Sequence, residues 1–354
     1  MKVGLVVPNN FFLTPYVKRY TDIFEREQVD YDIVYWNRHN IDESVRAKRV
    51  YAFTKPMDEL EPKHLKLAKY FMFRRFVEQK FKETSYDRVF VFGAVLGVFL
   101  CPFLRKEYYK RYIVDIRDFS YEDNRVFYGL ETKLLKGSLV TVISSEGYKE
   151  FLPPHDYVVV HNIVDWDNVE PRPTPDRARE TIRIAYVGFV RFLEQNLRLI
   201  KSLANDGRFH LMYIGKNAEK LLDFVTKNGI ANVTINSNLK PADTMNCYTD
   251  ADVVNNLYGN NTPALDHALS NRLYHAAQLK LPILVCPNTY MERISHEYKF
   301  GITVDLNKES FADSLYQQYH NIDWRMLRAG CDAFLEKVNH DNLAFEQAIR
   351  KALN

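Results

Sequence analysis

The chain has 354 residues, which is long for a single hydrophobic core and indicates two domains. Apolar residues make up 46% and charged residues 26%, a balance that excludes an intrinsically disordered chain. The formal net charge is only +3, which excludes the dense basic surface of a nucleic-acid-binding protein.

The first half alternates short apolar runs with longer helical patterns. Strands are predicted at residues 3–8, 30–36, 49–53, 86–93, 111–118, 139–144 and 156–162. Helices are predicted up to residue 24 and at residues 62–82, 95–106 and 144–152. The first strand is apolar without alternation, which is typical of a parallel strand buried on both faces. The alternation predicts an α/β fold with a doubly wound parallel sheet.

The composition changes after residue 162, where three prolines stand close together between Pro171 and Pro175. We expect an N-terminal domain over 1–165, a Pro-rich linker over 166–180 that acts as a hinge, and a C-terminal domain over 181–340. The same alternation restarts there, with strands at 181–188, 210–215, 232–236, 251–258, 282–287 and 301–305. The helical tail ends in residues 341–354, which could cross back to the first domain.

Three stretches of the second half carry a family resemblance: AYVGFVRFLEQNLRLIKSL, HLMYIGKNAEKL and SNRLYHAAQLKLPILVCPNTYMERISHEYKFGITVD. They resemble the donor domain of GT-B glycosyltransferases, nearest to the retaining family 4-like enzymes of capsule and lipopolysaccharide synthesis. The resemblance implies two Rossmann-like domains facing a cleft. It also implies a nucleotide-sugar donor, a UDP-sugar foremost, and transfer that retains the anomeric configuration.

The resemblance also implies a donor site at the ends of the second-half strands. Arg191 follows the Gly188 turn, where a cation meets the donor phosphates. A helix beginning near Ser270 offers backbone amides to a phosphate. The predicted donor-binding residues are Gly188, Arg191, Tyr258, Asn271, Arg272, Leu273, His275 and Glu292. Ordinary roles remain open for each, such as a solvated arginine, a packed tyrosine or a structural histidine.

Two departures from the family pattern affect this site. The usual pair of glutamates falls on His267 and His275, or on Asp266 and Tyr274 if the register shifts by one residue. The usual second lysine appears as Gln195. These changes leave room for a non-catalytic relative.

The first half offers candidates for the acceptor side. Asp115, Arg117 and Asp118 end a predicted strand, where a carboxylate could deprotonate an acceptor hydroxyl. Asp118 and Asp115, together with Arg191, are the predicted catalytic residues. Asn9, Asn10 and Arg117 are the predicted acceptor contacts. A divalent cation held by the two aspartates, or a strand-end salt bridge, are the alternatives, and we expect no metal.

Residues 63–82 predict a basic amphipathic helix. Its apolar stripe includes Leu65, Phe71 and Met72, and basic residues such as Arg74 and Arg75 surround it. Such a helix can rest on an anionic membrane, which would suit a lipid-linked acceptor. The alternative is a helix whose apolar face packs in the core.

The cysteines and the N-terminus favour a cytoplasmic protein, with contact at the inner face of the plasma membrane as an option. The four cysteines show no spacing typical of zinc sites or disulfides. The first residues are too short an apolar run for a signal peptide.

The sequence therefore predicts a glycosyltransferase that moves a hexose-type sugar from a nucleotide sugar to a glycan or lipid-linked glycan acceptor, without a cofactor. A non-catalytic GT-B partner or chaperone subunit of an active transferase is one alternative. A GT-B-fold nucleotide-sugar epimerase is another, although that reaction needs converging carboxylates that the sequence does not show.

Overall fold

The computed structural model describes residues 1–58, 60–164, 180–240 and 243–354. These residues form two compact units. Unit 1 contains residues 1–161 and 340–354, and unit 2 contains residues 162–339. The predicted hinge between Pro171 and Pro175 lies outside the described residues.

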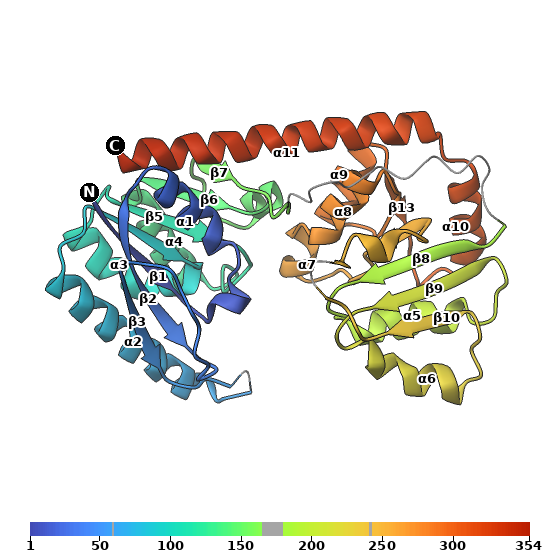
Figure 1. Cartoon of the computed structure of the whole chain (residues 1–354), viewed down its shortest axis with the longest axis horizontal. Coiled ribbons are helices and arrows are strands. Elements are labelled where there is room, and N and C mark those ends of the chain that lie inside the picture. The colour runs from blue at the N-terminus through green and yellow to red at the C-terminus, as the bar shows by residue number, and fades with distance from the viewer. Residues whose placement is uncertain (59, 165–179, 241–242) are drawn as a thin grey trace. The chain divides into compact units, whose positions relative to one another are not determined.

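Unit 1 is built on a parallel sheet of seven strands in the order β3-β2-β1-β4-β5-β6-β7 (Figure 1). The strands are β1 (Lys2–Val7), β2 (Asp30–Asn37), β3 (Arg49–Thr54), β4 (Arg88–Phe92), β5 (Tyr112–Ile116), β6 (Val140–Ile143) and β7 (Tyr157–Val159). The helices are α1 (Val17–Arg26), α2 (Lys63–Glu83), α3 (Ala94–Glu107) and α4 (Arg125–Gly137), with single turns η1 (Phe11–Leu13) and η2 (Glu146–Glu150).

Strand β1 shows why this sheet has helices on both faces. Val3, Leu5 and Val7 belong to a core that also contains Tyr20 and Phe24 of α1. Gly4 points the other way, because a Cβ there would lie 2.9 Å from the ring of Phe81 in α2. Successive residues of a strand face opposite sides, so a strand covered on both sides is apolar throughout, as the sequence predicts.

Unit 2 repeats this arrangement on a parallel sheet of six strands in the order β10-β9-β8-β11-β12-β13 (Figure 1). The strands are β8 (Ile182–Val187), β9 (Phe209–Ile214), β10 (Val233–Asn236), β11 (Val253–Asn255), β12 (Ile283–Val285) and β13 (Gly301–Thr303). The helices are α5 (Leu193–Ser202), α6 (Leu222–Lys227), α7 (Pro263–His267), α8 (Asn271–Leu279), α9 (Tyr290–Glu297), α10 (Phe311–His320) and α11 (Trp324–Leu353), with single turns η3 (Ala218–Leu221) and η5 (Asn246–Tyr248).

Helix α11 contributes to the cores of both units. Leu327, Cys331 and Phe334 pack in the core of unit 2 that also holds α8 and α9. Phe345 and Ile349 pack in the core of unit 1 beside α1. The helix spans 30 residues, and no helix among the described residues is long and apolar enough to cross a membrane.

Gly137 shows why a glycine stands at the end of helix α4. It is the last residue of α4, and its φ is not among the positive ones. A Cβ there would lie 2.4 Å from the hydroxyl of Tyr112 on β5. Glycine is therefore needed for a close helix–strand contact rather than for a left-handed turn.

Candidate functional site

The order of strands in unit 2 places a reversal between β8 and β11. From β8 the chain proceeds outward to β9 and β10, and from β11 it proceeds outward on the other side to β12 and β13. In open parallel sheets, ligands bind outside the carboxyl ends of the strands at such a reversal. The loops that follow β8 and β11 contain the predicted residues Gly188, Arg191 and Tyr258.

Arg272, in the first turn of α8, lies at this reversal. Its guanidinium stacks 3.6 Å from the ring centroid of Tyr186 on β8, and 5.3 Å from that of Tyr258. One of its nitrogens donates a hydrogen bond to the Tyr258 hydroxyl. A second nitrogen lies 3.4 Å from the position that a Cβ on Gly188 would take. The arginine predicted at the helix start and the predicted glycine turn are therefore neighbours.

The charge of Arg272 is buried without a neutralising acid. The residue is 5% exposed, and no carboxylate among the described residues pairs with it. Its Nε atom is buried and has no hydrogen-bond partner there. Burying a cation is costly unless it is paired, and aromatic faces compensate only part of that cost. Such a side chain favours an anionic ligand.

The loop after β8 is held in one shape by internal hydrogen bonds. Gly188 has φ +112°, which strongly favours glycine. The Arg191 amide donates to the Tyr186 hydroxyl at 3.0 Å, and the Asn196 side chain donates to the Arg191 carbonyl at 2.8 Å. The Arg191 side chain itself is exposed, and it forms no ion pair with the residues described. The Arg191 guanidinium is therefore accessible to a ligand, and its backbone is held in place by the loop.

Helix α8 begins without a side-chain cap. Ser270 occupies the N-cap position, but its hydroxyl donates 2.6 Å to Asn256 instead of accepting from the helix. Asn271 is exposed in the first turn. The Leu273 side chain is fully buried in the core, and its amide donates to the Ser270 carbonyl. Neither the side chain nor the amide is therefore available to a nucleotide sugar.

His275 lies one turn after Arg272 and is also buried. Its ring is 5.8 Å from the ring of Tyr248. Burial, reinforced by the charge of Arg272, lowers the pKa of His275 to about 4. The imidazole is therefore neutral near pH 7 and adds no charge to the site.

Glu292 holds the loop that precedes α9. Its carboxylate accepts from the Asn288 amide at 2.7 Å and from the Thr303 hydroxyl at 2.7 Å. The Thr289 hydroxyl in turn accepts from the Glu292 amide at 3.1 Å. This reciprocal pattern is a helix cap, so both carboxylate oxygens already serve the fold.

Asp115, one of the predicted catalytic residues in unit 1, lies in a buried ion pair. Asp115 is 1% exposed and makes two bonds to Arg117, at 2.6 and 2.7 Å. The Tyr20 hydroxyl donates to the same carboxylate at 2.5 Å. The alternative of a strand-end salt bridge is therefore confirmed for Asp115 and Arg117, because each already satisfies the other. Asp118, three residues along, is exposed.

The loop after β1 in unit 1 is also occupied by the chain itself. The side chain of Asn10 is fully buried and donates to Asn37 and Glu43, both at 2.8 Å. The carboxylate of Glu43 also accepts from the amides of Phe11 and Phe12 at 3.0 Å. Asn9 is partly exposed and accepts from the Asn10 amide. The Asn10 side chain and the Glu43 carboxylate are therefore already bonded within unit 1.

Sequence reasoning missed two tyrosines near Arg272, Tyr186 and Tyr248, and the cation of Lys216. Tyr186 and Tyr248 are at most 1% exposed, and in the sequence they are indistinguishable from core residues. Lys216 follows Gly215, the glycine turn after β9, just as the loop of Arg191 follows Gly188, the glycine turn after β8. This glycine directly after a strand was the sequence signal that could have identified Lys216. Among the described residues, no group of three or more His, Cys, Asp or Glu side chains could hold a metal ion.

Solved structures of sugar-transferring enzymes resemble the whole chain. A sucrose-phosphate synthase from Thermosynechococcus elongatus matches with a TM-score of 0.71 and 12% identity, covering 100% of this chain and 99% of that one. HepE from Anabaena, solved in complex with UDP, matches with a TM-score of 0.67 and 12% identity, covering 99% of this chain and 100% of that one. The lipopolysaccharide outer core galactosyltransferase WaaB matches with a TM-score of 0.66 and 15% identity, covering 100% of this chain and 99% of that one.

No protein-family model and no curated protein sequence matches the chain. The structural similarity extends over both units, with the two parallel sheets in the order given above. The chain therefore has the GT-B fold that these glycosyltransferases share.

Proposed function

We propose that this protein transfers a sugar from a nucleotide-sugar donor whose diphosphate binds at the carboxyl ends of β8 and β11. The observation that carries the proposal is Arg272, a buried cation with no acidic partner in the described part of the chain, beside the Gly188 turn. The fold supports a donor of this kind, because the similar protein HepE was solved with UDP and with UDP and glucose. A UDP-sugar is accordingly the first donor to test.

The site suits the leaving group of this reaction. When an acceptor hydroxyl attacks the anomeric carbon, the bond to the donor phosphate breaks and the diphosphate carries away the electron pair. Arg272 and Arg191 would stabilise that developing charge, and the uncapped start of α8 would add backbone amides. A buried cation is effective here because little water screens it. Retention of configuration follows only from the family resemblance.

The acceptor side of the proposal rests on unit 1. With Asp115 held by Arg117, the exposed Asp118 is the carboxylate at the end of β5 that could receive the acceptor proton. We propose a glycan acceptor, lipid-linked or free, of the kind used in capsule and surface polysaccharide synthesis.

A non-catalytic GT-B subunit remains the second candidate, and two observations favour it. His275 is neutral where the resembling family has a glutamate, and Asp115 is not available as a base. The candidates differ in one measurable respect. A transferase should release UDP from a UDP-sugar when supplied with an acceptor extract, whereas a binding subunit should bind UDP without turnover.

Replacing Arg191 by alanine should weaken UDP binding by about 1.5–3 kcal/mol, or roughly 10- to 150-fold. The reason is the loss of a charge-assisted hydrogen bond from a side chain that the loop holds in place. Isothermal calorimetry with UDP measures this. Lys201→Ala, on the last turn of α5, is the matched control. Unchanged affinity in Arg191→Ala would remove this residue from the site.

The outer face of α2 supports the proposed contact with a membrane. Phe73, Val77 and Phe81 face the core, whereas Leu65, Leu67, Phe71 and Met72 are 43–49% exposed. The alternative of a core-packed apolar face therefore holds for Phe73, Val77 and Phe81, and these four residues lie outside that face. Exposed Lys63, Arg75 and Lys82 have no acidic partner among the described residues, which suits an anionic surface.

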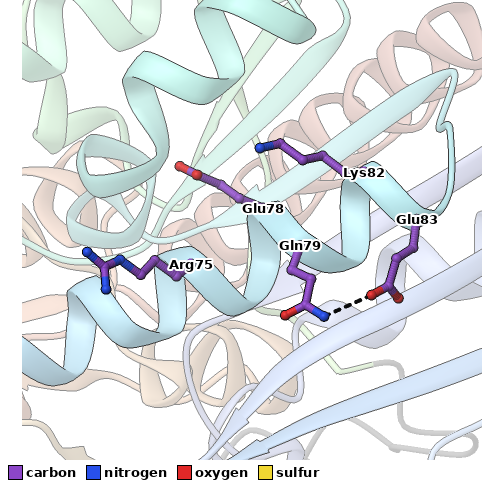
Figure 2. Close-up of a pocket in the computed structure, with 5 residues that line it drawn as sticks. All are labelled: Arg75, Glu78, Gln79, Lys82 and Glu83. Carbon is purple, nitrogen blue, oxygen red and sulfur yellow. Dashed lines mark hydrogen bonds between the residues drawn. The ribbon is translucent and has the colours of Figure 1, made fainter.

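The second half of α2 is less basic than the sequence indicates. Arg74 pairs with Glu78 at 2.6 Å, and Lys80 pairs with Glu83 at 2.8 Å. An open hollow of about 480 Å³ on this half is lined by Arg75, Glu78, Gln79, Lys82 and Glu83. Figure 2 shows these five side chains. Two cations and two acids line the hollow, so it is not a strong anion site. The apolar first half, flanked by Lys63 and Arg75, cations unpaired among the described residues, is the part expected to meet lipid.

Reversing two unpaired charges, Lys63→Glu with Arg75→Glu, should abolish binding to anionic vesicles. Each basic residue near such a surface contributes about 1 kcal/mol, so the pair accounts for at least roughly a 30-fold change. Co-sedimentation with phosphatidylglycerol vesicles at low salt measures it. The control carries Lys220→Glu with Lys227→Glu on unit 2. If the native protein stays in the supernatant, the membrane contact is refuted and the acceptor is a soluble one.

A further inference from the structure

The loops after β8 and β9 form one continuous surface at the carboxyl edge of unit 2. The parallel pairing of β8 and β9 continues beyond both strands, through bonds from the Gly188 amide to Ile214 and from the Val190 amide to Lys216, each 2.9 Å. The Asn217 side chain adds a bond to the Val190 carbonyl at 3.0 Å.

Two glycines make this close approach of the loops possible. Gly215 has φ +135°, and a Cβ there would lie 2.0 Å from the carbonyl oxygen of Gly188. No side chain fits in that space. Because the backbones touch, the residues that follow the two glycines, Arg191 and Lys216, are carried on the same rigid support.

The first turns of α5, which continue the loop after β8, supply no other open cation. Gln195 is neutral, and its amide lies 3.2 Å from the position of a Cβ on Gly259. Arg198 donates to the side chain of Asn307 at 2.8 Å. Lys216, in contrast, is exposed and has no acidic partner among the residues that the structure describes.

We propose that Lys216 is a diphosphate-binding residue that acts together with Arg191 from the neighbouring loop. This inference rests on the proposed function and adds to it a residue on β9's loop that the family resemblance does not indicate. A diphosphate carries more than one negative charge, and Arg272 is fixed against Tyr186 and Tyr258. A flexible lysine at the rim can follow the second phosphate, since an ammonium binds phosphate as a point charge without a fixed geometry.

The test compares Lys216→Gln with the native protein, using calorimetry with UDP, inorganic pyrophosphate and uridine. Affinity for UDP and for pyrophosphate should fall roughly 5- to 20-fold, while uridine binding should be unchanged. Lys216→Arg should restore most of the loss, because it keeps the charge. Pyrophosphate makes the result independent of which base the donor carries.

Lys220→Gln, the next lysine along the chain in η3, is the matched control and should bind all three ligands normally. If Lys216→Gln binds UDP and pyrophosphate as tightly as the native protein does, the role of Lys216 is overturned and the donor site itself is not. If the native protein binds neither UDP nor pyrophosphate, the proposed donor site falls with it. A melting temperature equal to that of the native protein excludes misfolding of the variant.

Discussion

Replacing Arg272 by methionine should reduce transfer from a UDP-sugar by roughly 10²- to 10³-fold, or about 2.7–4 kcal/mol in the barrier. A preorganised cation in a water-poor site has this effect because it faces the charge that develops on the leaving diphosphate. UDP affinity should fall in parallel. Activity against UDP-sugars and calorimetry with UDP measure the two quantities.

The same variant should keep or raise the stability of the protein without ligand. Arg272 is a buried cation with no acidic partner among the described residues, and methionine removes that cost while filling similar space between the tyrosines. A purely structural arginine would show the opposite result, a lower melting temperature with unchanged UDP affinity. Arg293→Met, which removes another arginine stacked on a tyrosine, is the matched control.

Replacing Glu131 by glutamine should stabilise unit 1 strongly at alkaline pH. Glu131 in α4 is fully buried, and neither carboxylate oxygen has a partner among the described residues. Burial raises the pKa of this carboxyl from 4.5 to about 8, and the nearby charge of Glu122 adds to the shift. The acid is therefore protonated at neutral pH in the folded protein.

The sign of the pH dependence follows from which state binds more protons. Between pH 4.5 and 8 the folded protein keeps a proton on Glu131 that the unfolded chain has lost, so stability falls as pH rises. The slope is about 1.4 kcal/mol per pH unit. Glu131→Gln removes this slope, so its advantage should be absent at pH 4 and amount to several kcal/mol at pH 8.5.

Urea unfolding of both proteins at these two pH values provides the measurement. Glu309→Gln, a change at an exposed glutamate, should show no such difference and serves as control. An advantage of Glu131→Gln that is the same at both pH values would mean that the carboxyl is not held protonated.

The sequence predicts β1 and β4 well because burial on both faces makes each one a nearly uninterrupted apolar run. Predicted residues 30–36 and 49–53 correspond to β2 and β3 within one residue at each end. The pattern fails where a helix has apolar residues all round. In α2 it cannot distinguish Phe73, which packs in the core, from Phe71, which is 47% exposed. Only the neighbouring elements decide which side of such a helix is buried.

The candidate site shows the same limit. Gly188 and Arg191 could be found from the sequence, because a glycine after a buried strand marks a loop at the carboxyl edge. The salt bridge between Asp115 and Arg117 could also be anticipated as an alternative, because the two residues are two positions apart. The bond from Tyr20 to Asp115, 95 positions away, and the stacking of Arg272 on Tyr186 could not. Contacts between residues so far apart in the chain leave no local pattern.

The packing of α11 in the cores of both units affects how the protein folds during synthesis. The core of unit 1 includes Phe345, Ile349 and Leu353, which are synthesised after the whole of unit 2. At about 5–20 residues per second, the N-terminal half waits on the order of ten seconds or more while unit 2 is synthesised. Through that interval the apolar surface of α1 that these residues cover stays open, to be held by a chaperone or lost to aggregation. Unit 2, although second in sequence, is the first that can be completed during synthesis.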